Sequence, residues 1–185
     1  MNKTVQDKLV LAFFALIVAG PILYYMVKST NDPTDPSFRI DSNGVPSIQM
    51  VDHDNDPEML LAMAQARKSV DQFIDSLVNQ TAGQEEFSVK VCILEFGEAN
   101  GEYVWLLPPV QYEDGLFSGP IGNIPSRQSG YEYGDKFVIA KDEIADWKYV
   151  EDGILQGGFT FRLMRSRLSE DEQRQLDNFT GFQVE

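Results

Sequence analysis

The sequence of 185 residues contains one cysteine and one histidine, which excludes several kinds of site. Cys92 alone allows no disulfide within the chain and no cluster of thiolate metal ligands. His53 would be the base of any serine or cysteine triad, yet it stands among aspartates and no G-x-S-x-G nucleophile elbow is present. A zinc site needs more Cys and His ligands than this. We therefore expect no catalytic residue, metal or cofactor.

Positive charge is also scarce. The chain has 15 Lys and Arg against 29 Asp and Glu, and residues 41–185 hold 11 of the basic and 26 of the acidic side chains, a net charge of −15. Nucleic-acid binding depends on Lys and Arg displacing counterions from phosphates, so no nucleic acid is expected as a partner. Such a domain would attract a basic protein. The alternative explanation is that the acidic surface only keeps the domain soluble.

Phosphate-binding and calcium-binding motifs are missing as well. No G-x-x-x-x-G-K-[ST] loop occurs. The stretch DHDND at 52–56 alternates aspartates as a calcium loop does, but Pro57 and Met63 occupy the positions where an EF-hand needs Gly and Glu. Asp56 followed by Pro57 is instead typical of a helix start, with the aspartate as cap.

One long hydrophobic run is present, Leu9–Val27, with 19 residues and no charge. As a helix it would span about 28 Å, close to the hydrocarbon thickness of a bilayer. A cleaved signal peptide is the alternative, but the best cleavage position, after Ala19, has a poor sequence context. We expect a membrane anchor.

The basic residues at the ends of this run predict its orientation. Lys3 and Lys8 precede it, whereas Lys28 alone follows it. The positive-inside rule then makes residues 1–8 a cytoplasmic tail. The prediction is a single-pass protein of the cell inner membrane, with residues 28–50, rich in Pro, Asp and Ser, as a tether and residues 51–185 as a periplasmic domain.

The domain itself shows helical and strand patterns in turn. From Pro57 to about Asn79 an apolar stripe recurs at helical spacing, formed by Leu60, Leu61, Ala64, Val70, Phe73, Ile74, Leu77 and Val78. Residues 87–96, 102–107, 116–118 and 136–140 read as short strands, and 151–153 as a hairpin turn. After residue 158 we favour a helix over a strand, followed by a helix that begins with a capping box at Ser169. An α+β domain results, with a twisted antiparallel sheet or half-barrel flanked by helices.

A few polar residues are candidates for binding. The long Gly- and Pro-rich loop at 119–135 offers donors and stacking faces, and GGFTFR at 157–162 could present free N–H groups to an anion. The structural alternatives are an ordered connection, and glycines that allow close backbone packing. Two aspartates near aromatic residues could serve either catalysis or turn closure. The candidates are Asn123, Arg127, Tyr131, Asp135, Asp146, Trp147 and Arg162.

Three stretches together resemble one family. They are DGLFSGPIGNIP, YGDKFVIAKDEIADWKY and GGFTFRLMRSRLS, and they are similar to the YegJ-like family of bacterial domains of unknown function over roughly residues 50–175. The resemblance implies a small α+β domain and no mechanism. By analogy, some domains of this general kind look like immunity modules that neutralise toxins. The matching positions are Gly119, Asn123, Pro125, Gly134, Asp135, Ile144, Asp146, Trp147, Gly157, Gly158, Thr160 and Arg162.

Two functions remain open at this point. The first is a non-catalytic, membrane-anchored interaction module of the bacterial envelope, of immunity type, whose acidic face meets a basic protein. The second is an enzyme of hydrolase type with Asp135, Asp146 and Arg162 around one pocket. The oligomeric state does not follow from the sequence.

Overall fold

The computed structural model describes residues 38–40, 46–48, 56–93, 102–123, 125 and 129–185. The expected anchor at 9–27, His53 and Arg127 lie outside these residues. Within the described part, no helix has the length and apolar character needed to cross a bilayer. Strands β1 (Phe38–Ile40) and β2 (Pro46–Ile48) pair antiparallel, a pairing that the sequence did not predict.

The leading helical segment is divided into two helices. Helix α2 (Pro57–Lys68) begins at the expected cap, where the Asp56 carboxylate accepts hydrogen bonds from the N–H groups of Glu58 and Met59. At Ser69 the single predicted helix breaks, and α3 (Val70–Val78) follows. The Ser69 hydroxyl lies 2.8 Å from the Gln65 carbonyl and 3.2 Å from the Ala66 carbonyl. Such bonds to preceding carbonyls compete with the helical ladder and bend helices.

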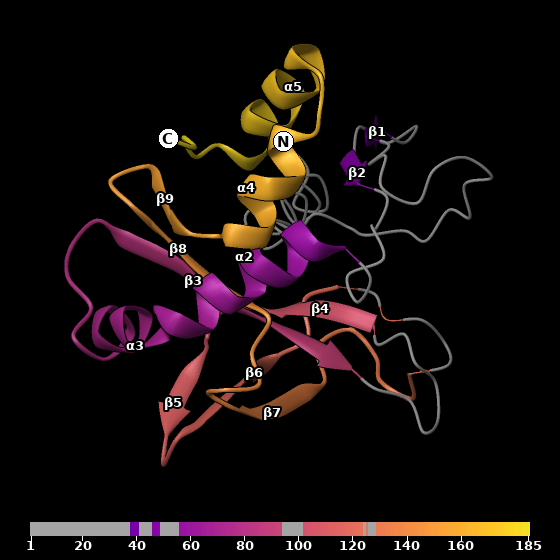
Figure 1. Ribbon diagram of the computed structural model, residues 1–185. Coiled ribbons are helices and arrows are strands. Elements are labelled where there is room, and N and C mark those ends of the chain that lie inside the picture. The colour runs from indigo at the N-terminus through magenta and orange to yellow at the C-terminus, as the bar shows by residue number, and fades with distance from the viewer. Residues whose placement is uncertain (1–37, 41–45, 49–55, 94–101, 124, 126–128) are drawn as a thin grey trace, which may run out of the picture.

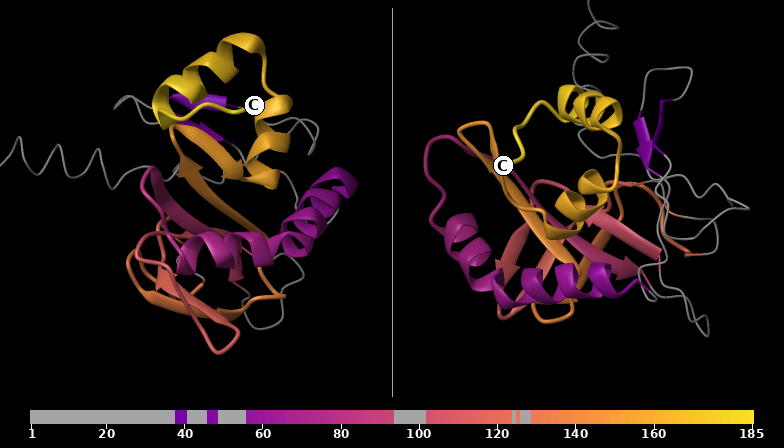
Figure 2. Two further views of the ribbon diagram at one scale, coloured as in Figure 1. Left: turned by 90° about the vertical axis from the view of Figure 1, so that its left-hand side faces the viewer. Right: turned by 45° about the horizontal axis from the view of Figure 1, so that its top comes forward.

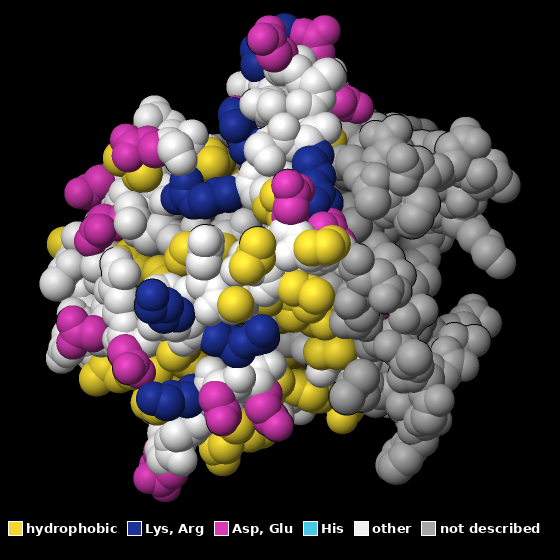
Figure 3. All heavy atoms as spheres, in the orientation of Figure 1, with side chains coloured by type: hydrophobic (Ala, Val, Ile, Leu, Met, Phe, Trp, Pro, Cys, Tyr) yellow, Lys and Arg dark blue, Asp and Glu magenta, His cyan; other side chains and the backbone are white. Residues whose placement is uncertain are grey.

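The apolar stripe predicted from Pro57 to about Asn79 is wrong in its first half and at its last member, Val78, which is 63% exposed. Leu60 and Leu61 are 43% and 64% exposed, and Ala64 is also exposed. The buried face of α2 is formed by Met59, Ala62, Met63 and Ala66. Small alanines let α2 approach α4 closely, and flexible methionines fill the remaining space, so this face packs rather than the leucine face. Figure 3 shows hydrophobic side chains on the surface along this helix.

The central layer is a four-stranded antiparallel sheet of order β4-β3-β8-β9. Its strands are β3 (Gln84–Ile93), β4 (Glu102–Leu106), β8 (Asp146–Glu151) and β9 (Ile154–Gly157). The turn between β8 and β9 is the predicted one, with Asp152 and Gly153 at positive φ. A bulge interrupts β3 between Glu85 and Ser88.

A second, three-stranded antiparallel sheet continues from the edge of β4. It has the order β5-β6-β7 and consists of β5 (Gln111–Glu113), β6 (Leu116–Pro120) and β7 (Lys136–Ala140). The Leu107 N–H donates to the Pro120 carbonyl, and the Gly122 N–H donates to the Trp105 carbonyl. The end of β6 therefore covers the outer edge of β4 and joins the two sheets. The antiparallel α+β class expected from the sequence is confirmed.

Helices cover both faces of the central sheet (Figures 1 and 2). On one face, the central sheet, α3 and the three-stranded sheet enclose a core that includes Phe73, Val89 and Trp147. On the other face, α4 (Phe159–Ser166) and α5 (Glu170–Thr180) enclose a second core with Phe161 and Leu176. The helix favoured after residue 158 and the capping box at Ser169 are both confirmed.

Candidate functional site

A group of charged side chains lies inside the molecule, on the face of the central sheet that α4 covers. The strand register places Lys90 of β3 directly opposite Asp146 of β8. Neither side chain is exposed to solvent, nor is that of Thr160 on α4. Charged residues are almost never fully buried unless they are paired. We call Lys90, Asp146 and Thr160 the buried polar cluster.

Asp146 uses both of its carboxylate oxygens to hold backbone and hydroxyl groups. Its Oδ1 accepts from the N–H groups of Trp147 at 2.8 Å and Phe159 at 3.1 Å. Its Oδ2 accepts from the Thr160 N–H and the Thr160 hydroxyl, both at 2.7 Å. The carboxylate therefore occupies the positive end of the α4 dipole.

This arrangement shows whether the N–H groups of the GGFTFR motif are free to bind an anion. The residue that caps α4, Gly158, has no side chain and lies in the left-handed region at φ 63°, so it provides no cap of its own. The N–H groups that an external anion would use are bonded to Asp146 instead. The anion at this helix start is a residue of the chain itself.

Lys90 completes the cluster from β3. Its ammonium group donates to the Thr160 hydroxyl at 3.3 Å and lies 5.8 Å from the centre of the Tyr103 ring. Burial lowers the pKa of Lys90 to about 8, and the nearby Asp146 charge opposes that shift. Burial also raises the pKa of Asp146, although the Thr160 hydroxyl, Lys90 and two backbone N–H groups act in the other direction.

A second lysine is buried on the same sheet face. Lys148 is only 8% exposed and lies between the Trp105 and Phe182 rings, at 5.8 and 5.6 Å from their centres. Glu86 in the β3 bulge approaches its ammonium group to 3.7 Å. Burial lowers the pKa of Lys148, and Glu86 opposes this shift.

The cluster resembles the arrangement of an activated nucleophile without giving access to a substrate. A hydroxyl between a lysine of lowered pKa and a carboxylate is a pattern that nucleophilic catalysis uses. Here, however, the Thr160 hydroxyl donates to Asp146, accepts from Lys90 and has no exposed surface. What the geometry can do is fix α4 on the sheet by charge-assisted hydrogen bonds.

Lys90 gives the cluster a measurable pH dependence. Between pH about 8 and the ordinary pKa near 10.5, the unfolded chain binds a proton at Lys90 and the folded chain does not. The free energy of unfolding should therefore rise with pH through this range. Compared with Lys90→Met, the wild type should gain about 2 kcal/mol between pH ~8 and ~10 in urea unfolding. A difference that stays constant over this range would contradict the assignment.

The Gly-Gly pair allows the backbone to pass close to Trp147. A Cβ atom on Gly157 would lie 2.4 Å from two ring carbons of Trp147 and from its carbonyl oxygen. The Trp147 ring stacks on Phe73, and its Nε1 donates to the Ala66 carbonyl at 2.9 Å. Trp147 is therefore a core residue that links β8, β9 and α2.

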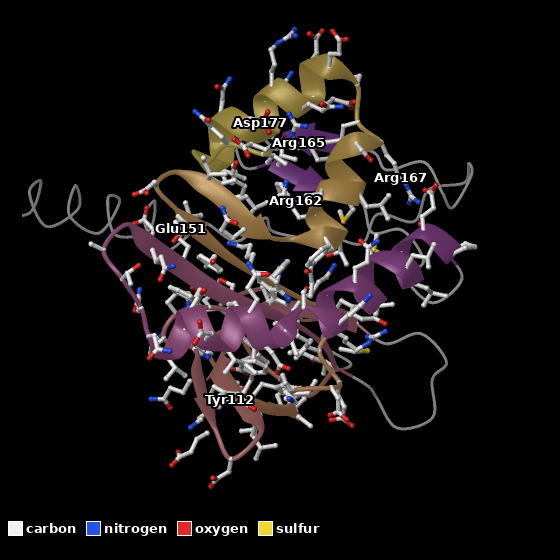
Figure 4. The ribbon with its side chains drawn as sticks, turned by 60° about the vertical axis from the view of Figure 1, so that its left-hand side comes forward. Tyr112, Glu151, Arg162, Arg165, Arg167 and Asp177 are labelled. Atoms are coloured by element: carbon white, nitrogen blue, oxygen red, sulfur yellow. The ribbon has the colours of Figure 1, made fainter. Side chains whose placement is uncertain are left out.

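Three arginines at the C-terminal side of this motif connect α4 to its neighbours (Figure 4). Arg162 donates to the carbonyls of Gly157, Leu155 and Glu185, which ties β9 and the chain end to α4. Arg165 forms a two-point ion pair with Asp177 of α5. Arg167 pairs with Asp56 and Glu58 at the start of α2, and this hydrogen bond lowers the pKa of Asp56.

The remaining candidate residues lie apart from the cluster. Asn123 is buried, and its Oδ1 accepts from the Trp105 N–H at 2.7 Å. Tyr131 is partly exposed and meets Phe137 edge to face. Asp135 is exposed and closes a turn by accepting from the Glu132 N–H at 2.8 Å.

These contacts bring together only some of the predicted residues. Asp146 and Arg162 both lie at the start of α4, where the aspartate acts electrostatically on the arginine while burial lowers the pKa of Arg162. Asp135 lies at the start of β7 in the other sheet. Lys90 and Lys148 were not predicted as site residues, although each is a lysine inside an apolar run, SVKVCI and DWKYV respectively.

Comparison with known proteins supports the resemblance seen in the sequence. A family model described as an uncharacterized protein conserved in bacteria (DUF2314) matches residues 56–184. The uncharacterized protein YegJ of Escherichia coli K12 is 33% identical over 115 residues, which are 62% of this chain and 72% of YegJ. A putative ankyrin repeat protein of Neisseria meningitidis serogroup B is 35% identical over 96 residues, 50% of this chain and 37% of that protein. No solved structure matches the chain.

Proposed function

The chain belongs to the DUF2314 family of uncharacterized bacterial proteins, and on that premise we propose that it is a non-catalytic module that binds a basic protein partner. One observation carries this proposal: the polar residues of the family-like motifs are engaged in holding the fold. Asp146 holds the start of α4, Asn123 holds β4, and Arg162 holds three backbone carbonyls. The hydrogen-bonding groups of these side chains therefore have partners within the domain.

The charge of the domain indicates the kind of partner. Residues 41–185 carry a net charge of −15, and the ion pairs of the described residues leave many exposed carboxylates without a cation. A protein surface rich in Lys and Arg would be attracted over distances of about the Debye length. The meningococcal relative is named as a putative ankyrin repeat protein, and ankyrin repeats form extended binding surfaces. That name supports an interaction role, and the immunity type is our extension of it.

The proposal includes the membrane arrangement that the sequence suggests. Residues 1–8 form a cytoplasmic tail, Leu9–Val27 spans the inner membrane, residues 28–50 tether the domain, and residues 51–185 act in the periplasm. The support is the uncharged run of 19 residues and the basic residues that precede it. Anchoring would confine the acidic domain to a partner in the envelope.

Crosslinking in cells tests this function. The tagged full chain should sediment with membranes and crosslink to a protein of net positive charge. Capture after detergent solubilisation should fall steeply between about 0.1 and 0.5 M salt, because screening weakens attraction between exposed charges. Recovery of the chain in the soluble fraction would contradict the anchor. A crosslinked partner that is acidic, or whose capture is indifferent to salt, would contradict the proposed binding mode.

A further inference from the structure

The outer edge of β7 has backbone groups that no other strand of the described residues uses. The register pairs Phe117 with Ile139 and Gly119 with Phe137. On either side of these pairs, Lys141 donates to the Gly115 carbonyl and Ile121 donates to the Asp135 carbonyl. In an antiparallel ladder hydrogen-bonded pairs alternate with non-bonded ones, so the odd-numbered residues of β7 bond to β6. The backbone groups of Lys136, Val138 and Ala140 therefore point away from β6.

Within the described part of the chain, this edge is open. The N–H and C=O groups of Lys136 and Val138 and the N–H of Ala140 have no partner there, while the Ala140 carbonyl accepts from Glu143. The edges of the four-stranded sheet, by contrast, are covered: Gln183 exchanges hydrogen bonds with Leu155 and Gly153 at β9, and residues 120–122 pair with β4. An exposed strand edge is a template for a further strand.

The surroundings of this edge combine apolar and acidic side chains. Val138 is 51% exposed, and Leu116, close by on the same face of the sheet, is 44% exposed. Asp135 precedes β7, whereas Asp142 and Glu143 follow it, and all three are exposed. Two lysines lie among them: Lys136 is exposed, and Lys141 forms an ion pair with Asp71, so carboxylates remain in excess. Figures 1 and 2 place this sheet at the end of the molecule opposite α5. The edge is thus bracketed by carboxylates at both ends.

We propose that the outer edge of β7 binds an extended basic segment of the partner as an additional antiparallel strand. Backbone hydrogen bonds to Lys136, Val138 and Ala140 would supply affinity, and the flanking carboxylates would select Lys and Arg near both ends of the segment. A second copy of the same edge fits less well, because it would bring together two domains that each carry a net charge of −15 in residues 41–185. The inference names the surface and the partner segment, and so it rests on the proposed function.

A synthetic peptide provides a direct probe. We would titrate the full chain, in mild detergent, into a fluorescent peptide of seven alternating Lys and Val residues with blocked ends. Saturable binding that weakens with salt is expected, together with hydrogen-exchange protection confined to the β7 edge. The matched peptide of alternating Glu and Val should bind at least about tenfold more weakly. Absence of saturable binding up to about millimolar concentration, or protection elsewhere, would overturn the inference.

Substitutions at the edge separate strand addition from charge attraction alone. Val138→Pro removes an N–H that points away from β6, a place where proline is tolerated on edge strands. It should weaken peptide binding by about tenfold, whereas Val138→Ala, which keeps the N–H, should change it by less than about twofold. Circular dichroism would show that both variants fold. Equal binding by the two variants means that backbone pairing is not involved.

A charge variant with a matched control tests the bracketing carboxylates. Asp142→Asn with Glu143→Gln should weaken peptide binding about fivefold at low salt, whereas Glu170→Gln with Asp171→Asn, the same change of charge on α5, should leave it nearly unchanged.

If the β7 variants still capture the basic partner in cells as the wild type does, the edge inference fails while the proposed function stands. If the wild type captures no such partner, the proposed function fails. Self-association lost on Val138→Pro would show that a second copy, not a basic partner, occupies the edge.

Discussion

Replacement of Asp146 by alanine is expected to lower the free energy of unfolding by about 3–5 kcal/mol, a large part of the stability of a typical domain. The change removes the acceptor of three backbone N–H groups and of the Thr160 hydroxyl. It also leaves Lys90 inside the molecule without the charge that opposes its deprotonation. Both effects are large because Lys90, Trp147 and Thr160 are buried, so their polar groups cannot form hydrogen bonds to water instead.

Urea unfolding of the full chain, followed by circular dichroism, measures this effect. The control is Asp142→Ala, since Asp142 is exposed and its loss should change stability by less than about 0.5 kcal/mol. Asp146→Asn should fall between the two, because one amide oxygen still accepts hydrogen bonds from the start of α4. A loss below about 1 kcal/mol for Asp146→Ala would mean that the cluster does not hold α4 in place.

The second large effect is expected at Gly157. Gly157→Ala should destabilise the protein by about 3 kcal/mol or more, because the added methyl group would overlap the Trp147 ring and carbonyl at 2.4 Å and the residue has φ 66°. Neither Trp147 nor the backbone it touches can move away without disturbing the core formed with Phe73.

Gly153→Ala isolates the cost of the backbone conformation alone. Gly153 also has positive φ, at 80°, but a Cβ there would meet nothing within 4 Å. Its replacement should cost only about 1 kcal/mol, and the difference between the two variants measures the close approach to Trp147. Thermal unfolding at matched pH gives both values. Equal losses of stability in the two variants would show that the close approach to Trp147 does not contribute to the effect of Gly157→Ala.

Local signals in the sequence predicted local structure well. The Asp-Pro-Glu start of α2, the Ser169 capping box and the turn at 151–153 all form as expected, because each depends on residues within a few positions of one another. Of the two interpretations of Gly157 and Gly158, close backbone packing is the one that the structure shows, whereas Trp147, named as a binding candidate, lies in the core. The α+β class followed from the order of these elements.

What the sequence could not predict depends on tertiary contacts. Two apolar stripes are present on α2, one of leucines and one of methionines and alanines, and only the packing of α4 decides between them. Lys90 is buried because Asp146, distant in sequence, stands opposite it in the sheet. The role of Asp146 as the cap of a helix that begins 13 residues later likewise depends on the β8–β9 hairpin, which brings the start of α4 back to this side chain.

These results link the motif residues to a single physical task. The hairpin of β8 and β9 carries Asp146 and Trp147 at one end and delivers the Gly-Gly pair beside them. From there α4 starts on the Asp146 carboxylate, and its arginines attach β9, α5 and α2. The surface available for a partner then lies elsewhere, and the open edge of β7 is the part of it that we propose is used.

The most direct test of this account is the effect of Thr160→Val on the in-cell crosslink to the basic partner, measured per folded molecule. Valine keeps the shape of threonine and removes only the hydroxyl that joins Lys90 to Asp146. The account predicts a clear loss of stability in urea unfolding and an unchanged crosslink yield. A fully folded variant of normal stability that no longer supports the crosslink would contradict it, because the hydroxyl would then serve function directly rather than hold the fold.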